Sequence, residues 1–207
     1  KDLKYMNDNL ETLRIFILKS KLLQYPYKAM YNNSSNELMI LEEDDTIYHE
    51  LLHLSCNNRK NKTTIRGFTH YTKKQKNILS FGTGLDEVYT EILANRLFNK
   101  EINATTPKTV ELVLQLEQLI DNLPSLYLNS DLYELVLELS KYTSLNESLE
   151  FIYNIDRLYT LEQNIKNHDK YNEIYSKTLY FLKQYQYKRN YQEQKKKILK
   201  RELMVLI

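Results

Sequence analysis

One pentapeptide of this 207-residue chain, His49-Glu50-Leu51-Leu52-His53, restricts its fold and chemistry more than any other feature. On a helix, residues four positions apart share a face, so His49 and His53 would present two imidazoles together, with Glu50 at the edge of that face. Neutral imidazoles bind zinc at about 2.0–2.1 Å, and a catalytic zinc takes a third protein ligand and keeps its fourth position open. The motif therefore predicts a helix, a zinc ion (Zn²⁺) and a third ligand elsewhere in the chain.

A second helix predicted downstream supplies candidates for that ligand. It follows the segment Gly82-Thr83-Gly84. Glu87 would lie in its first turn, and Glu91 would follow one turn later on the same face. Such an acidic pair alone is more typical of a solvated helix face. Its significance comes from its position after the two histidines.

Together the two segments resemble the gluzincin metallopeptidases, the thermolysin-like clan of zincins, whose second helix carries an Asn-Glu-x-x-x-Asp pattern. In this chain Asp86-Glu87-x-x-x-Glu91 occupies the pattern, with Glu in place of the final Asp. The resemblance extends over residues 36–98. It implies that Glu87 is the third zinc ligand and that Glu91 accepts a hydrogen bond from the outer N–H of one zinc-bound histidine.

The activity that the resemblance implies is hydrolysis of peptide bonds in a peptide or protein substrate. Glu50 would act as general base on a zinc-bound water and then deliver the proton to the leaving amine. The oxyanion needs a further donor besides the metal, and gluzincins often use Tyr or His for this purpose. His70 and Tyr71 are the candidates here because they lie close to the motif in the sequence.

Short strands are predicted on both sides of the zinc helix. Residues 36–41 are typical of a strand, and the acidic residues 42–45 would supply a turn and a helix N-cap. The resemblance implies that this strand is an edge strand that binds substrate by strand addition. Residues 65–71 and 78–81 would pair as a hairpin, with 73–76 as its turn.

The connection from Leu51 to Leu85 contains no Asp or Glu but seven cations. If it borders the cleft, it would favour substrates with acidic side chains or a free carboxylate. The alternative is an ordinary solvated hairpin. The cations are Arg59, Lys60, Lys62, Arg66, Lys73, Lys74 and Lys76.

Beyond residue 105 the sequence pattern is helical. Pro107 would start one helix, the segment 123–125 would break it, and Ser144 with Glu147 forms a capping box for another. We therefore expect a mainly α (α+β) fold, with a zincin-like catalytic lobe over residues 1–105 that contains a small sheet or hairpin. A helical lobe over 106–207 would pack on it, unless the two form one continuous domain.

The C-terminal segment, predicted as one long helix from about residue 169, ends in a basic stretch at 195–201. This stretch is either an amphipathic end that docks on a membrane or a partner, or an ordinary last helix whose cations suit its dipole.

Composition restricts the partners. The net charge of +2 is too near neutral to indicate a nucleic-acid partner for the whole chain. The single cysteine, Cys56, excludes an intramolecular disulfide, and no apolar run is long enough for a transmembrane span. We therefore expect a cytoplasmic protein, unless a signal or anchor precedes Lys1. The sequence does not indicate an oligomeric state.

Two other functions share the same motif. A non-catalytic module with a zincin fold would use its C-terminal helices to bind or regulate a partner. A zinc hydrolase of non-peptide amides would use the same zinc chemistry. Glu50 argues against the non-catalytic module, because a structural zinc site has no use for a base.

Overall fold

The computed structural model describes residues 4–18, 28–41, 45–58, 65–74, 77–99, 105–164 and 168–205. Over this part of the chain the fold is mainly α with small β-sheets, as the sequence predicts. The helices are α1 Lys4–Leu10, α2 Thr46–Ser55, α3 Thr83–Leu97, α4 Pro107–Leu119, α5 Leu123–Leu128, α6 Leu132–Ser140, α7 Leu145–Gln163 and α8 His168–Val205.

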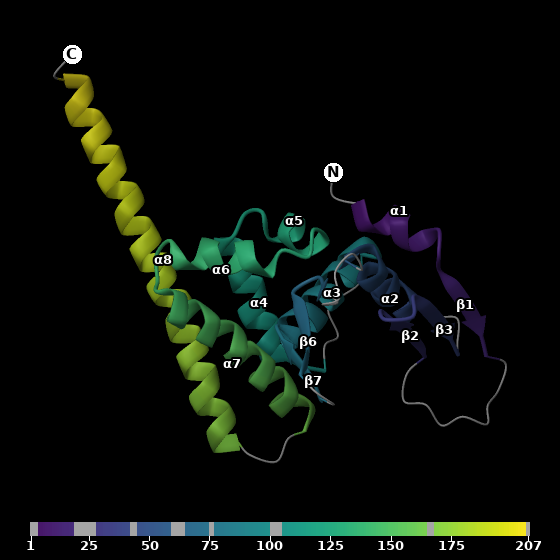
Figure 1. Cartoon of the computed structure of the whole chain (residues 1–207). Coiled ribbons are helices and arrows are strands. Elements are labelled where there is room, and N and C mark those ends of the chain that lie inside the picture. Colours follow the sequence, from purple (N-terminus) through teal and green to yellow (C-terminus); the bar gives the residue numbers. More distant parts are fainter. Residues whose placement is uncertain are drawn as a thin grey trace.

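The elements form a row in which α2 and α3 lie between a small sheet and the C-terminal helices (Figure 1). The sheet has the order β1-β3-β2, with β1 Arg14–Ile17 parallel and β2 Ala29–Asn32 antiparallel to β3 Glu37–Ile40. The prediction of a strand at 36–41 is confirmed, but the prediction that it is an edge strand is wrong. The preceding residues 14–17 supply a partner strand, so β3 is central and β2 is an edge.

A second sheet follows α2 and contains the predicted hairpin. Its strands, all antiparallel and in chain order, are β4 Asn57–Asn58, β5 Ile65–Arg66, β6 Thr69–Lys74 and β7 Asn77–Phe81. The expected strand 65–71 is instead divided by a turn at Gly67. Lys73 and Lys74 lie in β6 and not in the hairpin turn, and residues 75–76 lie outside the described part.

Two glycines bring the second sheet close to α3. Gly67 has φ +49°, and a Cβ there would lie 2.0 Å from Asp86 Oδ1. Gly82 has φ +81° and precedes α3, and a Cβ there would lie 2.1 Å from the carbonyl oxygen of Phe68. Both positions require glycine because of the left-handed φ and the close approach of other atoms.

The described side chains form two cores. A small one lies at the first sheet and contains Tyr31, Leu38 and Leu54. A large one runs from Cys56 to Tyr185 and includes residues on both sides of position 105. The helical lobe therefore packs on the second sheet and α3 through a shared core, and the boundary at 105 stays a prediction.

Several predicted helix boundaries are found in the helical lobe. Pro107 is the first residue of α4, and the Ser144–Glu147 capping box is formed at the start of α7. The break predicted at 123–125 is instead the first turn of α5, because proline is tolerated there. No helix in the described ranges is long and apolar enough to cross a membrane.

Candidate metal centre

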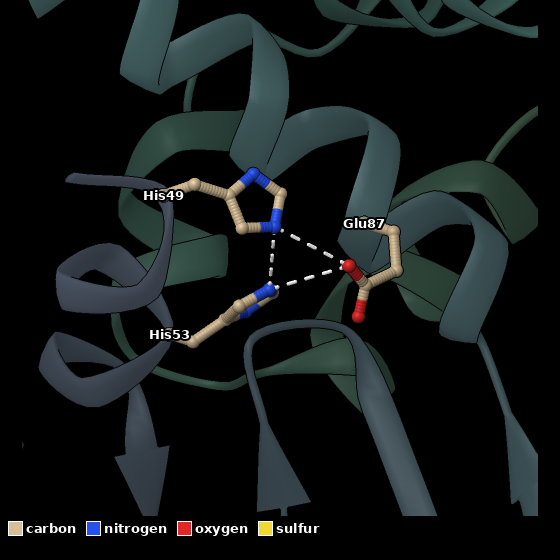
Figure 2. A group of neighbouring side chains, drawn as sticks. All are labelled: His49, His53 and Glu87. Atoms are coloured by element: carbon tan, nitrogen blue, oxygen red, sulfur yellow. Dashed lines mark hydrogen bonds and ion pairs between the residues drawn. The ribbon is translucent and has the colours of Figure 1, made fainter. Parts of the chain in front are cut away.

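Helices α2 and α3 bring together three side chains whose ligand atoms form a triangle (Figure 2). The Nε2 atoms of His49 and His53 are 3.0 Å apart, and Glu87 Oε2 lies 3.3 Å from the first and 3.4 Å from the second. Tetrahedral zinc with bonds of about 2.0–2.1 Å requires its ligand atoms to be about 3.3–3.4 Å apart. The triangle therefore has the dimensions of three zinc ligands.

The outer nitrogens of both histidines face oxygen acceptors. His49 Nδ1 lies 3.2 Å from Glu91 Oε2, which is the position expected of that residue. His53 Nδ1 lies 3.5 Å from Asp86 Oδ2 and 3.5 Å from Thr90 Oγ1. Protons on the two Nδ1 atoms leave a lone pair on each Nε2. These lone pairs and Glu87 Oε2 then meet at one place, where a cation would relieve their repulsion.

The pKa shifts of the two histidines also indicate that positive charge is favoured at the triangle. Burial lowers the pKa of His49, but the carboxylates of Glu87 and Glu91 outweigh it and raise that pKa to about 10. Burial and the charge of Arg66 lower the pKa of His53 to about 3. A proton on His49 therefore supplies positive charge at the triangle.

Two neighbours of the triangle, Asp86 and Arg66, were not predicted as parts of the site. Arg66, buried at the end of β5, contacts Asp86 Oδ2 through Nε and Nη2, both at 3.1 Å. Its Nη2 also lies 2.5 Å from Glu87 Oε1. The sequence contains one indication that Asp86 belongs to the site, namely that it directly precedes the predicted ligand Glu87. No local pattern distinguishes Arg66 from the other cations of the basic segment.

The position of Arg66 changes the interpretation of that basic segment. Its guanidinium is buried and paired with two carboxylates, so it does not present a positive charge to substrate. The remaining cations are not described: residues 59–64 and 75–76 lie outside the described part, as do the side chains of Lys73 and Lys74. The preference for acidic substrates stays a prediction.

The helical lobe holds the beginning of α3. Asp156 of α7 accepts hydrogen bonds from the backbone N–H groups of Gly82 and Gly84, both at 2.7 Å. Burial raises the pKa of this carboxyl, although these N–H groups act in the opposite direction. A Cβ at Gly84 would lie 2.8 Å from the Cα of Asp156, so glycine allows α7 to approach. An acceptor more than 70 positions away cannot be recognised from local sequence.

The Glu50 side chain extends from α2 to the edge strand β2. Its Oε2 accepts a hydrogen bond from the backbone N–H of Tyr31 at 2.8 Å. Burial raises the pKa of the Glu50 carboxyl, while His49 and the Tyr31 N–H act to lower it. The structure thus places the predicted base directly beside one candidate ligand, His49, with one oxygen held by the backbone.

The two candidate oxyanion donors lie on opposite faces of β6, because successive side chains of a strand alternate. His70 is exposed. Tyr71 is largely buried, and burial raises its pKa, which also responds to the charges of Arg66, Asp86 and Glu87. The structure therefore brings Tyr71 toward the cluster and directs His70 away from it. Either role stays a prediction.

The cluster is reachable from solvent on one side. The His49 side chain is 17% exposed and that of Glu87 is 24% exposed, whereas His53 is 2% exposed. A cavity of about 160 Å³ borders this side. Its lining includes His49, Glu87, Glu91, Thr106, Val110 and Tyr159.

The chain matches no protein-family model, no curated protein and no solved structure. The resemblance to gluzincins therefore depends on the motif residues and on their arrangement in space.

Proposed function

We propose that this protein is a zinc-dependent metallopeptidase of the gluzincin type. The observation that carries the proposal is the triangle of His49 Nε2, His53 Nε2 and Glu87 Oε2, with separations of 3.0–3.4 Å. Three protein ligands with a fourth position open are typical of catalytic zinc, whereas structural sites usually have four. Glu50 beside this triangle favours an enzyme over a non-catalytic module.

The charges around the triangle also favour a dication. Four carboxylates, those of Glu50, Asp86, Glu87 and Glu91, surround it, and Arg66 balances only one negative charge. Asp86 is buried and the other three are partly exposed, and carboxylates gathered in this way are costly unless cations compensate them. Zn²⁺ would supply two of the missing positive charges.

When bound, zinc would polarise the scissile carbonyl and lower the pKa of the attacking water. Glu50 would accept the proton of that water and transfer it to the leaving amine. The Tyr31 N–H holds Glu50 Oε2, which leaves Oε1 for the proton. Tyr71 would donate a hydrogen bond to the developing oxyanion.

The edge strand favours a peptide over a non-peptide amide as substrate. The N–H of Leu41 donates to the carbonyl of Lys28 at 2.8 Å. Because pairs alternate along an antiparallel ladder, the backbone groups of Ala29 and Tyr31 point away from β3. That edge lies next to Glu50, and an extended substrate would pair with it by displacing the groups that cover Ala29, which is 3% exposed.

The experiment compares wild type with Glu50→Gln, which removes the base and nearly keeps the shape. Zinc content and cleavage of a peptide library are measured for both. We expect about one zinc per chain in each protein, and a loss of turnover on the order of 10² or more in the variant. Glu150→Gln, at an exposed position of α7, is the matched control. Equal activity of wild type and Glu50→Gln, or activity after complete zinc removal, would refute the mechanism.

A further inference from the structure

The buried guanidinium of Arg66 contacts two carboxylates of the candidate metal centre at once. It binds Asp86 Oδ2 through two nitrogens at 3.1 Å and Glu87 Oε1 through one nitrogen at 2.5 Å. A cation this close to a zinc site opposes metal binding by repulsion. Its position beside the site therefore indicates a geometric role whose benefit exceeds the cost of the repulsion.

The two oxygens of Glu87 are divided between different partners. Oε1 is held by Arg66, whereas Oε2 lies 3.3 Å from His49 Nε2 and 3.4 Å from His53 Nε2. A carboxylate can bind a metal through one oxygen or through both. An acceptor already engaged by a charged donor is a poor second ligand, because the charge-assisted hydrogen bond must first be broken.

Asp86 connects the same guanidinium to His53. Its Oδ2 contacts both nitrogens of Arg66 and lies 3.5 Å from His53 Nδ1, while its Oδ1 accepts the backbone N–H of Phe68 at 2.9 Å. This carboxylate is therefore fixed from two sides. Together with Thr90 Oγ1, which also lies 3.5 Å from His53 Nδ1, this fixed acceptor favours a proton on Nδ1 and leaves Nε2 directed into the triangle.

We propose that Arg66 is a positioning residue of the metal centre, which keeps Glu87 a one-oxygen ligand and holds Asp86 against His53. The proposal rests on the metal site of the proposed function. The planar fork of arginine can bridge two carboxylates, whereas the point charge of lysine cannot reproduce that geometry. Arg66→Lys therefore keeps the charge and removes the bridge.

The test measures zinc affinity by competition with a chromophoric chelator, and the visible spectrum of the cobalt-loaded protein. We expect Arg66→Lys to bind zinc about ten- to a hundredfold more weakly than wild type. With Oε1 released, Glu87 can bind through both oxygens. The cobalt bands should then weaken, because five-coordinate cobalt absorbs less strongly than four-coordinate cobalt.

Arg96→Lys is the matched control, because Arg96 forms a bidentate pair with Glu117 on the side of α3 away from the ligands. It should leave affinity and spectrum unchanged. If Arg66→Lys does not fold, a double variant, Arg66→Met with Asp86→Asn, replaces it. The double variant removes both charges of the buried pair, and we expect the same change in its cobalt spectrum.

The outcomes separate this proposal from the proposed function. Wild type that binds neither zinc nor cobalt overturns both. Wild type that binds metal, together with folded Arg66 variants of unchanged affinity and spectrum, overturns the role of Arg66 alone. Weaker affinity with a changed cobalt spectrum supports it, since a merely structural role would not alter the coordination number.

Discussion

Helices α2 and α3 both carry residues of the candidate metal centre, but contacts of very different range place those residues. His49 and His53 are one turn apart on α2, so the helix alone sets their relative position. Glu87 reaches the same place because α3 packs into the shared core and its beginning is held by Arg66, Asp156 and the turn at Gly67. Half of the site thus follows from local spacing, and the other half depends on the whole fold.

The largest effect that tests this comparison should come from Gly67→Ala. The new Cβ would lie 2.0 Å from Asp86 Oδ1, at a left-handed φ of +49°. Strain and overpacking together should lower the free energy of unfolding by about 3 kcal/mol, measured by urea denaturation. Thr72→Ala, at an exposed position of β6, should change it by less than about 0.5 kcal/mol. A Gly67→Ala protein as stable as wild type would show that α3 does not depend on this turn.

The next largest effect concerns the ligands themselves. Glu87→Ala removes an atom of the triangle, so zinc affinity should fall by about tenfold or more beyond the loss in Glu91→Ala. Glu91→Ala should be milder, because Glu91 only contacts the outer nitrogen of His49. Chelator competition measures both. Full zinc retention in Glu87→Ala would exclude it as a ligand, and a larger loss in Glu91→Ala would mean that the ligand is one turn further along α3.

Asp156→Ala tests the long-range contact at the beginning of α3. The variant leaves the N–H groups of Gly82 and Gly84 without their acceptor. Loss of a helix cap should lower the free energy of unfolding by about 1–2 kcal/mol in urea denaturation. Asp121→Ala, where the side chain is 86% exposed, should have a much smaller effect. Equal effects of the two substitutions would contradict a role of α7 in placing α3.

What the sequence predicts follows the same division between local and long-range contacts. The start of α4 at Pro107 and the Ser144 capping box are matters of spacing within one helix, and the structure has them as expected. The contact of Glu91 with His49 joins two helices, and it was expected only because of the resemblance to gluzincins. Arg66 and Asp156 act across 20 or more positions, so no local pattern marks them.

The strand order illustrates the same limit. Residues 37–40 have the pattern of a strand, but nothing local shows that residues 14–17 pair with them. The sequence therefore does not show which strand has its free edge next to Glu50, whereas the structure shows that it is β2. Likewise, alternation along β6 predicts that His70 and Tyr71 lie on opposite faces of the strand. It does not show which face packs toward Arg66, and the structure shows that it is the face of Tyr71.

The smallest effect should come from the ion pair at the other end of α3. Arg96 binds both oxygens of Glu117 on α4, at 2.6 and 2.5 Å, and this lowers the pKa of the Glu117 carboxyl. A carboxyl whose pKa is lower in the folded state stabilises the fold above its ordinary pKa of 4.5, and that contribution is lost as the pH falls. Because Arg96 is half-exposed, Glu117→Gln should cost only about 0.5 kcal/mol near neutral pH. The difference from wild type should shrink as the pH falls below 4.5 in urea denaturation, whereas Glu150→Gln should differ little from wild type at any pH. A cost above that of Asp156→Ala would mean that α3 is held mainly by this ion pair and not at its beginning.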